Sequence, residues 1–276
     1  MALLGRPNVG KSTLVNRIVG AKVAITSPVP HTTRTRVRGV LDRPDAQVVF
    51  VDTPGIHKPK TALGSRMNDT ASQLIGDVDL CVLMVEASSA VGRGDAFIAS
   101  RLPAGSVVAV NKTDAASRRQ VLDHLQAAAE DLGLEGAEYF AISARTGAGV
   151  EGLVEHVVGR MPPGPRYFPP GTVTDVPEAF MVAELVREQL IANATEELPH
   201  SIACRVTEWE WPRIRCEILV ERDSQKGIVI GRGGSVLKAA GTAVRRQLAE
   251  GAYVELFVKV EKSWQRHAEM IERLGY

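Results

Sequence analysis

Residues 5–12 read Gly5-Arg6-Pro7-Asn8-Val9-Gly10-Lys11-Ser12 and fit the pattern G-x-x-x-x-G-K-[ST] of phosphate-binding loops. The apolar residues 2–4 before this loop predict a buried strand, and residues 13–19 after it place apolar side chains on one helical face. The two glycines let successive backbone N–H groups surround a phosphate, and the N-terminus of the helix adds its positive dipole. The sequence therefore predicts a strand–loop–helix unit in which Lys11 contacts the β- and γ-phosphates and the Ser12 hydroxyl ligates Mg²⁺.

Three later motifs narrow the nucleotide to GTP. Asp52-Thr53-Pro54-Gly55 follows the apolar run 48–51 and offers a carboxylate to Mg²⁺ and the Gly55 N–H to a γ-phosphate. Asn111-Lys112-Thr113-Asp114 follows the predicted strand 106–110, and its last carboxylate can accept from both the N1–H and the amino group of guanine. Ser143-Ala144 follows the strand 139–142, so its backbone N–H groups are expected to meet the guanine O6. All three motifs come at the carboxyl end of a predicted parallel strand, where ligands bind in open α/β sheets.

The remaining Mg²⁺ ligand is expected on the Pro-, Ser- and Thr-rich loop 26–34, which offers Thr32 and Thr33. We favour Thr33, the residue directly before Arg34. The predicted metal ligands are thus Ser12, Thr33 and Asp52, and the predicted catalytic groups are Lys11, Thr33 and Gly55. The full set of predicted nucleotide-binding residues is Gly5, Asn8, Val9, Gly10, Lys11, Ser12, Thr13, Asp52, Gly55, Asn111, Lys112, Asp114, Ser143 and Ala144.

Ile56 occupies the position at which Ras-type GTPases carry the glutamine that orients the attacking water. An alkyl side chain cannot hydrogen-bond a water, so hydrolysis must depend on backbone groups, metal ions or a partner and should be slow alone. Asn8 has two readings of equal weight, a K⁺ ligand beside the phosphates or a side chain that stabilises the loop. His57 invites a role as catalytic base, but a histidine in such a loop is more often structural.

Composition indicates a soluble globular chain with room for two domains. No apolar run approaches the roughly 18 residues of a membrane-spanning helix. Cys81, Cys204 and Cys216 each lie in an apolar, strand-like context without metal-ligand spacing, so we expect reduced core cysteines in a cytoplasmic protein.

The stretch Met161-Pro162-Pro163-Gly164-Pro165-Arg166-Tyr167-Phe168-Pro169-Pro170-Gly171 contains five prolines, all within residues 162–171. This composition predicts a stiff, extended connector over residues 162–171. Before it, predicted strands at 37–42, 48–51, 79–87, 106–110 and 139–142 alternate with predicted helices that include 117–132 and 150–158. This alternation predicts an α/β domain with a mostly parallel sheet over residues 1–161. After it, residues 172–276 predict a smaller α+β domain: a helix at 178–193, three period-two strands, and a helix–Gly–helix region at 225–250.

The second domain carries Gly231-Arg232-Gly233-Gly234 between two predicted helices. A G-x-x-G loop beside a three-stranded sheet is typical of KH domains (type II here), which bind single-stranded nucleic acid. Residues 222–248 hold six cationic side chains against one carboxylate, although residues 172–276 as a whole are slightly acidic. A local basic patch predicts a phosphate contact. The expected RNA-binding residues are Lys226, Ile228, Ile230, Gly231, Arg232, Gly233, Gly234 and Lys238.

These motifs, in this order, make the chain resemble the Era family of bacterial GTPases along its whole length. The resemblance also uses His31-Thr32-Thr33-Arg34 and Asp52-Thr53-Pro54-Gly55-Ile56-His57-Lys58-Pro59, with His31 in place of the usual glutamine. It implies a GTP-hydrolysing, Mg²⁺-dependent switch that binds the 3′ end of small-subunit (16S) ribosomal RNA and assists assembly of the 30S subunit. It further implies a monomer, in the cytoplasm or peripheral on the cytoplasmic face of the cell membrane. Two alternatives are a membrane-associated cell-cycle signalling GTPase and an RNA-binding scaffold with weak GTPase activity.

Overall fold

The computed structural model describes residues 1–193 and 198–276, which form two compact units. Met1–Thr26, Pro30–Pro59 and Gly64–Asp175 make the first unit, and Ser27–Val29, Lys60–Leu63 and Val176–Tyr276 make the second. The predicted connector at 162–171 falls within the first unit, while the three domain limits given above stay predictions. Within the described residues no helix has both the length and the apolar character needed to cross a membrane.

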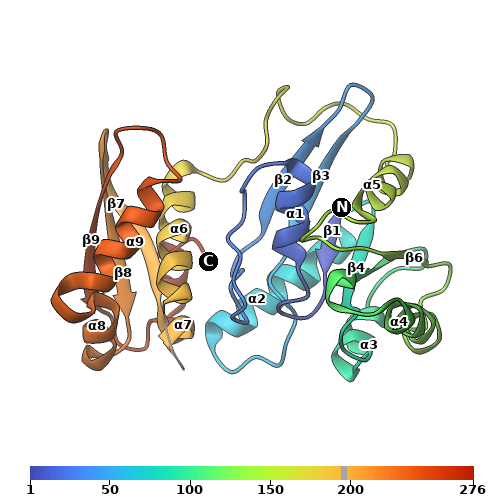
Figure 1. The fold of residues 1–276 in the computed structure, drawn as a ribbon, viewed down its shortest axis with the longest axis horizontal. Coiled ribbons are helices and arrows are strands. Elements are labelled where there is room, and N and C mark those ends of the chain that lie inside the picture. Colours follow the sequence, from blue (N-terminus) through green and yellow to red (C-terminus); the bar gives the residue numbers. More distant parts are fainter. Residues whose placement is uncertain (194–197) are drawn as a thin grey trace. The chain divides into compact units, whose positions relative to one another are not determined.

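A six-stranded sheet in the order β2-β3-β1-β4-β5-β6 forms the centre of the first unit (Figure 1). Every neighbouring pair is parallel except β2 and β3, which form an antiparallel hairpin. The inner strands β4 and β5 are apolar almost throughout, as expected of parallel strands covered on both faces. This confirms the predicted α/β fold. The strands are β1 (Ala2–Leu4), β2 (Val37–Asp42), β3 (Gln47–Asp52), β4 (Cys81–Glu86), β5 (Val107–Asn111) and β6 (Glu138–Ala141).

The helices of this unit are α1 (Lys11–Val19), α2 (Ala62–Gln73), α3 (Arg93–Ala99), α4 (Arg118–Asp131) and α5 (Val150–Gly159). Apolar side chains of α2, α3 and α4 join those of β1, β4 and β5 in one buried cluster. Helix α1 packs on β2 and β3, so close to β2 that a side chain at Gly39 would come within 2.5 Å of Val15 Cγ1. The sequence predicted α1, α4 and α5 but not α2 and α3. In the polar sequence of α2, a spacing of four residues between the buried Leu63, Met67 and Ala71 was the available signal.

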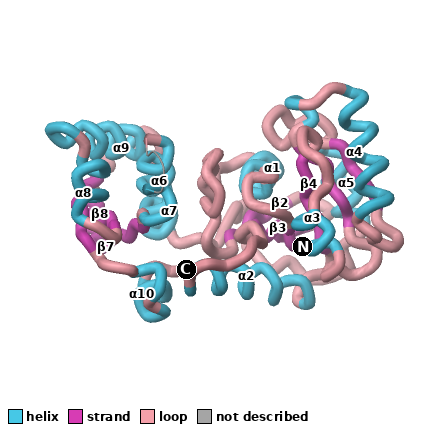
Figure 2. Tube along the Cα trace, turned by 90° about the horizontal axis from the view of Figure 1, so that it is seen from below, coloured by secondary structure: helices cyan, strands magenta, loops and turns pink. Residues whose placement is uncertain are grey.

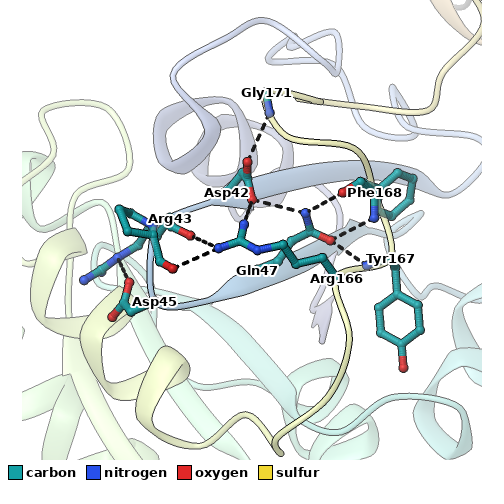
Figure 3. A network of polar contacts seen from close by, with 9 residues as sticks. Asp42, Arg43, Asp45, Gln47, Arg166, Tyr167, Phe168 and Gly171 are labelled. Carbon is teal, nitrogen blue, oxygen red and sulfur yellow. Dashed lines mark hydrogen bonds and ion pairs between the residues drawn. The ribbon is translucent and has the colours of Figure 1, made fainter.

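The segment that follows α5 lies along the β2–β3 hairpin, and we call residues 166–175 the strap (Figure 3). Gln47 Oε1 accepts hydrogen bonds from the backbone N–H groups of Tyr167 and Phe168, both at 2.9 Å. The Asp42 carboxylate accepts from the Gly171 N–H at 3.0 Å and pairs with Arg166, and these contacts hold the pKa of Asp42 below its usual value, with the Gly171 bond the largest cause. Three further contacts fasten the strap to β2: Val40 N–H to Val173 O (2.9 Å), Thr174 Oγ1 to Arg38 O (2.7 Å) and the ion pair Arg38–Asp175.

The second unit contains a three-stranded sheet in the order β7-β8-β9, with β8 antiparallel to β7 and parallel to β9. Along β8 the side chains of Ile214, Cys216 and Ile218 alternate into the core. Helices α6 and α9 pack against each other and against this sheet (Figure 2). The predicted α+β architecture is confirmed. Its elements are α6 (Glu178–Ala192), α7 (Leu198–Ser201), β7 (Ala203–Glu210), β8 (Arg213–Val220), α8 (Asp223–Ile230), α9 (Ser235–Arg245), β9 (Tyr253–Val260) and α10 (Ala268–Arg273).

The three cysteines are buried and none forms a disulfide, as the sequence predicted. Burial raises the pKa of the Cys81 thiol to about 11. A buried thiol whose pKa is raised in this way is a poor nucleophile and metal ligand, so Cys81 serves packing.

Candidate functional site

The Lys11 ammonium lies inside the predicted phosphate-binding loop, at the start of α1. Its Nζ donates to the carbonyl oxygens of Gly5 (3.2 Å) and Arg6 (3.0 Å), and only 6% of the residue is exposed. Burial lowers the pKa of Lys11 to about 8, while the charge of Asp52 acts in the opposite direction. The loop therefore holds a desolvated cation at the position where a phosphate would neutralise it.

Three oxygen-bearing side chains meet at the end of β3. The Ser12 hydroxyl donates to Asp52 Oδ2 at 2.6 Å and lies 2.9 Å from Thr33 Oγ1, which also donates to Asp52 Oδ2, at 3.3 Å. Burial raises the pKa of the fully enclosed Asp52 carboxyl, against the opposing charge of Lys11. Asp52 Oδ1 is buried and has no hydrogen-bond partner among residues 1–193 and 198–276. A carboxylate oxygen without a partner beside two hydroxyls is a donor set that Mg²⁺ prefers, so the predicted ligands fit this ion.

Of the two threonines that the loop offered, it is Thr33 that reaches Ser12 and Asp52. Its assignment as a metal ligand stays a prediction, but the geometry supports the choice over the neighbouring residue.

The backbone of Gly55 lies directly against the phosphate-binding loop. A side chain here would come within 2.5 Å of the Pro7 nitrogen, so only glycine permits this approach. Ile56, next in the chain, donates its backbone N–H to Gly5 O at 3.3 Å and buries its side chain in the core. It therefore cannot orient a water, as predicted from the sequence.

His57 is held by several neighbours. Its ring lies 3.9 Å from that of His31, its Nδ1 is 3.0 Å from Gly55 O, and its backbone exchanges two hydrogen bonds with the side chain of Asn68. These contacts support a structural role for His57 over one as catalytic base.

Asn111 links three of the predicted loops. Its amide donates to Val9 O at 2.7 Å, and its Oδ1 accepts from the Ala144 N–H at 2.9 Å. A side chain at Gly10, whose φ is 101°, would collide with this amide. The asparagine of the motif thus ties the phosphate loop to the guanine loops, a structural role that the sequence did not predict.

Asp114 lies beside the loop that contains Ser143 and Ala144. Its Oδ1 accepts from the Ser143 hydroxyl and its Oδ2 pairs with the Arg145 guanidinium, both at 2.5 Å. The Ser143 hydrogen bond, followed by the charge of Arg145, lowers the pKa of Asp114, which keeps this carboxylate ionised as an acceptor. The N–H groups predicted to meet guanine O6 have acceptors within the chain, because Ser143 N–H donates to Ala148 O and Ala144 N–H to Asn111. The O6 contact stays a prediction.

Arg17 on α1 contacts the loop that contains Ser143 and Ala144, and the sequence did not predict this contact. Its guanidinium donates to Ala144 O at 3.3 Å and to Arg145 O, although 127 or more residues separate the partners in the chain. Ala144 and Arg145 line a cavity of about 520 Å³ together with α1 and with residues from the segment 20–26. A lone exposed arginine has no pattern that marks it before the fold is known.

The loop 231–234 of the second unit joins α8 to α9. Gly231, Gly233 and Gly234 all have positive φ, at 74°, 59° and 80°. A side chain at Gly231 would press on Val236, whereas the other two glycines face open space. Arg232, Lys238 and Ile228 are exposed around the loop, Lys226 and Ile230 are half-buried, and Ile228 is 53% exposed despite being apolar.

Beside this loop, α9 and β9 enclose a groove of about 430 Å³. Lys238 and Arg245 line it from the helix, and Tyr253 and Leu256 line it from the strand. Cations with an aromatic ring along a groove are typical of surfaces that bind single-stranded nucleic acid. Of the predicted RNA-binding residues, Lys238 lines this groove, which the sequence did not reveal.

Known families match both units. A family of GTPases described as 50S ribosome-binding matches residues 1–112, and the KH domain family matches residues 197–265. GTPase Era of Mycobacterium tuberculosis (strain ATCC 25618 / H37Rv) is 44% identical over 294 aligned positions that cover 100% of this chain and 97% of that protein. GTPase Era of Mycobacterium avium (strain 104) is 42% identical with the same coverage.

Two solved structures resemble the chain along its full length. The crystal structure of a variant of Aquifex aeolicus Era bound to GDP and aluminium fluoride gives a TM-score of 0.93 at 35% identity. The structure of an Era in complex with MgGDPNP and nucleotides 1506–1542 of 16S ribosomal RNA gives 0.94, also at 35% identity. Each comparison covers 100% of this chain and 97% of the other.

Proposed function

The chain belongs to the Era family of GTPases, and on this premise we propose that it binds the 3′ end of small-subunit (16S) ribosomal RNA through its second unit and assists assembly of the 30S subunit. The full-length similarity to GTPase Era proteins confirms the family resemblance that the motifs predicted, and with it the GTPase activity. The observation that carries the RNA proposal is the open loop 231–234, in which Gly233 and Gly234 leave room for a phosphate backbone beside exposed cations.

For hydrolysis, we propose that the Lys11 ammonium and the Gly55 N–H stabilise the negative charge on the γ-phosphate. Ser12, Thr33 and Asp52 would hold Mg²⁺, which supplies positive charge to the phosphates when bound. The burial of Lys11 and Asp52 supports this assignment, because charges act more strongly where water is excluded. Asp114 would select guanine, held in place by Ser143.

The buried Ile56 leaves no side chain at its position to orient the attacking water. We therefore propose a slow intrinsic reaction that is accelerated by a partner or by a monovalent cation. Asn8 is our candidate ligand for K⁺, since it lies within the phosphate loop with a positive φ of 65°. A monomeric state and peripheral membrane association stay predictions, for which sedimentation and vesicle flotation are the direct tests.

The RNA proposal is tested by crosslinking the full chain to RNA in cells and sequencing the bound fragments. We expect enrichment of the 3′ end of 16S ribosomal RNA. Recovery of no RNA, with intact GTPase activity, would support the signalling alternative, in which the KH fold contacts a protein. Recovery of this RNA without any single-turnover GTP hydrolysis would support the scaffold alternative.

A further inference from the structure

The side chain of Arg6, inside the phosphate-binding loop, lies against the first turn of α3. Its Nε is 3.1 Å from Asp95 Oδ1. A side chain at Gly94 would come within 2.9 Å of Arg6 Cδ, so the aliphatic part of the arginine packs on the helix backbone. The pattern of phosphate-binding loops leaves this position unspecified, and the sequence assigns it no role.

Asp95 is a buried carboxylate, with 2% of the residue exposed. Its Oδ2 accepts from the Gly92 N–H at 3.0 Å, which caps the start of α3. Its ion pair is with Arg6, whose side chain is 37% exposed. Because a buried charge left without its partner is strongly unfavourable, Asp95 constrains where Arg6 can lie.

The backbone of Arg6 reaches the two groups assigned to the γ-phosphate. Its carbonyl accepts from Lys11 Nζ at 3.0 Å, and the next residue, Pro7, sets how closely Gly55 approaches. A shift of Arg6 would therefore move the ammonium and the glycine N–H together. A second carboxylate near Arg6, Glu86, forms an ion pair at 2.9 Å with Lys112 of the guanine motif.

We propose that Arg6 and Asp95 are a pair of positioning residues for GTP hydrolysis. The pair fixes the first half of the phosphate-binding loop to α3, so that Lys11 and the Gly55 N–H converge on one phosphate. The proposal rests on the phosphate roles proposed above for Lys11 and Gly55. It adds a residue outside the four GTPase motifs to the machinery of the reaction.

The test compares Arg6→Gln, Asp95→Asn and the double variant in the full chain. Asp95→Asn keeps the size of the side chain and an oxygen that can accept from Gly92, but removes the charge. We expect each single variant to bind a fluorescent GTP analogue about tenfold more weakly, and the double variant to be no worse than either single variant. Arg6→Lys, which keeps the charge but not the guanidinium, should recover part of the affinity.

A merely structural pair would lower the melting temperature without changing affinity at temperatures where the variants are folded. Arg43→Gln is the matched control, because Arg43 is similarly exposed and paired with Glu155 but remote from the phosphate loop. Folded variants with wild-type affinity and turnover would overturn the proposal, as would additive losses in the double variant. Should Asp95→Asn fail to fold, Arg6→Gln and Arg6→Lys decide the question alone. Lys11→Ala tests the phosphate site separately: wild-type affinity in that variant would refute the assignment on which the pair depends.

Discussion

Gly5 and Gly55 of the first unit lie against neighbouring backbone, whereas Gly233 and Gly234 of the second unit face open space. A side chain at Gly5 would come within 2.5 Å of Met84 O, but one at either glycine of the second unit would meet no atom within 4 Å. The cationic side chains of the two proposed sites differ in exposure as well: Lys11 is buried, whereas Arg232 is exposed.

This difference matches the two ligands that we propose. A nucleotide is compact, so its site can surround it with groups that already bond one another. A polynucleotide continues past its site on both sides, so its site must stay open. Substitutions in the first site should therefore act through geometry and desolvation, and those in the second through charge and ionic strength.

The largest effect is expected from Asp114→Asn in the nucleotide site. The carboxamide cannot accept from both guanine donors, but its N–H₂ can donate to the C2 oxygen of xanthine. Preference for GTP over XTP should change by a factor on the order of 10⁴, because a site that hydrogen-bonds the donors of one ligand rejects a ligand that leaves those groups without partners. Competition binding with the two nucleotides measures it. Asp123→Asn, an exposed carboxylate on α4, is the control. Unchanged preference in Asp114→Asn would show that another group reads the base.

In the open site, Arg232→Asp combined with Gly233→Asp should weaken RNA binding about 100-fold. Two carboxylates would face the phosphates, and a side chain at Gly233 would fill the space that the backbone needs. Titration with a single-stranded oligonucleotide ending in the 16S 3′ sequence measures the loss, which should shrink as salt is raised. Intrinsic GTP hydrolysis should stay unchanged.

Arg273→Asp alters charge elsewhere in the same unit and should leave RNA affinity within a few fold. A folded double variant, verified by circular dichroism, that binds the oligonucleotide as tightly as wild type would remove the RNA assignment from this loop.

The buried Lys11 predicts a pH dependence of GTP affinity. Its pKa of about 8 lies below that of the unfolded chain, and bound phosphate should raise it again. Affinity should therefore be flat below pH 8 and fall about tenfold per unit above it, because binding then requires proton uptake. The same linkage predicts that the nucleotide-free protein gains stability as the pH rises through 8, where the folded chain releases this proton and the unfolded chain keeps it. Fluorescence titration from neutral to alkaline pH measures the affinity. Since guanine N1–H also ionises in alkali, competition by inorganic triphosphate isolates the lysine.

The smallest effect is expected from exchanging Na⁺ for K⁺ at constant ionic strength. If Asn8 holds K⁺, turnover should rise several-fold, far below the roughly 10³–10⁵ of an arginine finger. Asn8→Ala should remove the difference between the salts while it retains nucleotide binding. Equal turnover of the wild type in both salts would favour the loop-stabilising role of Asn8.

The sequence predicted those helices and strands whose spacing of apolar residues and whose capping or turn residues are visible in the local sequence. β2 begins and ends where period and turn residues indicated, and α4 begins after Ser117, whose hydroxyl accepts from Gln120 N–H. The order of the motifs also placed Ser12 and Asp52 together, because β1 and β3 are parallel and end at one edge of the sheet. The local sequence was thus sufficient to predict the position of a residue whose role depends on the end of its own strand or on its own loop.

Contacts that depend on the third dimension were not predictable in this way. Arg6 and Asp95 belong to separate elements, and no periodicity relates them. The Gln47 side chain that receives the strap lies 120 residues earlier in the chain. The short α3, seven residues that include Gly94, has too little pattern to distinguish it from a loop.

The strap has a consequence for how the first unit can be isolated. β2 is an edge strand of its sheet, and its free backbone groups would invite pairing with another chain. Val173 and Thr174 occupy two of those groups, and Pro169 and Pro170 of the strap cannot extend a ladder. A fragment that stops at residue 161 would expose this edge and tend to aggregate, while one that continues to Asp175 would carry its own cover. The strap thus protects the GTPase unit from pairing with other chains along β2.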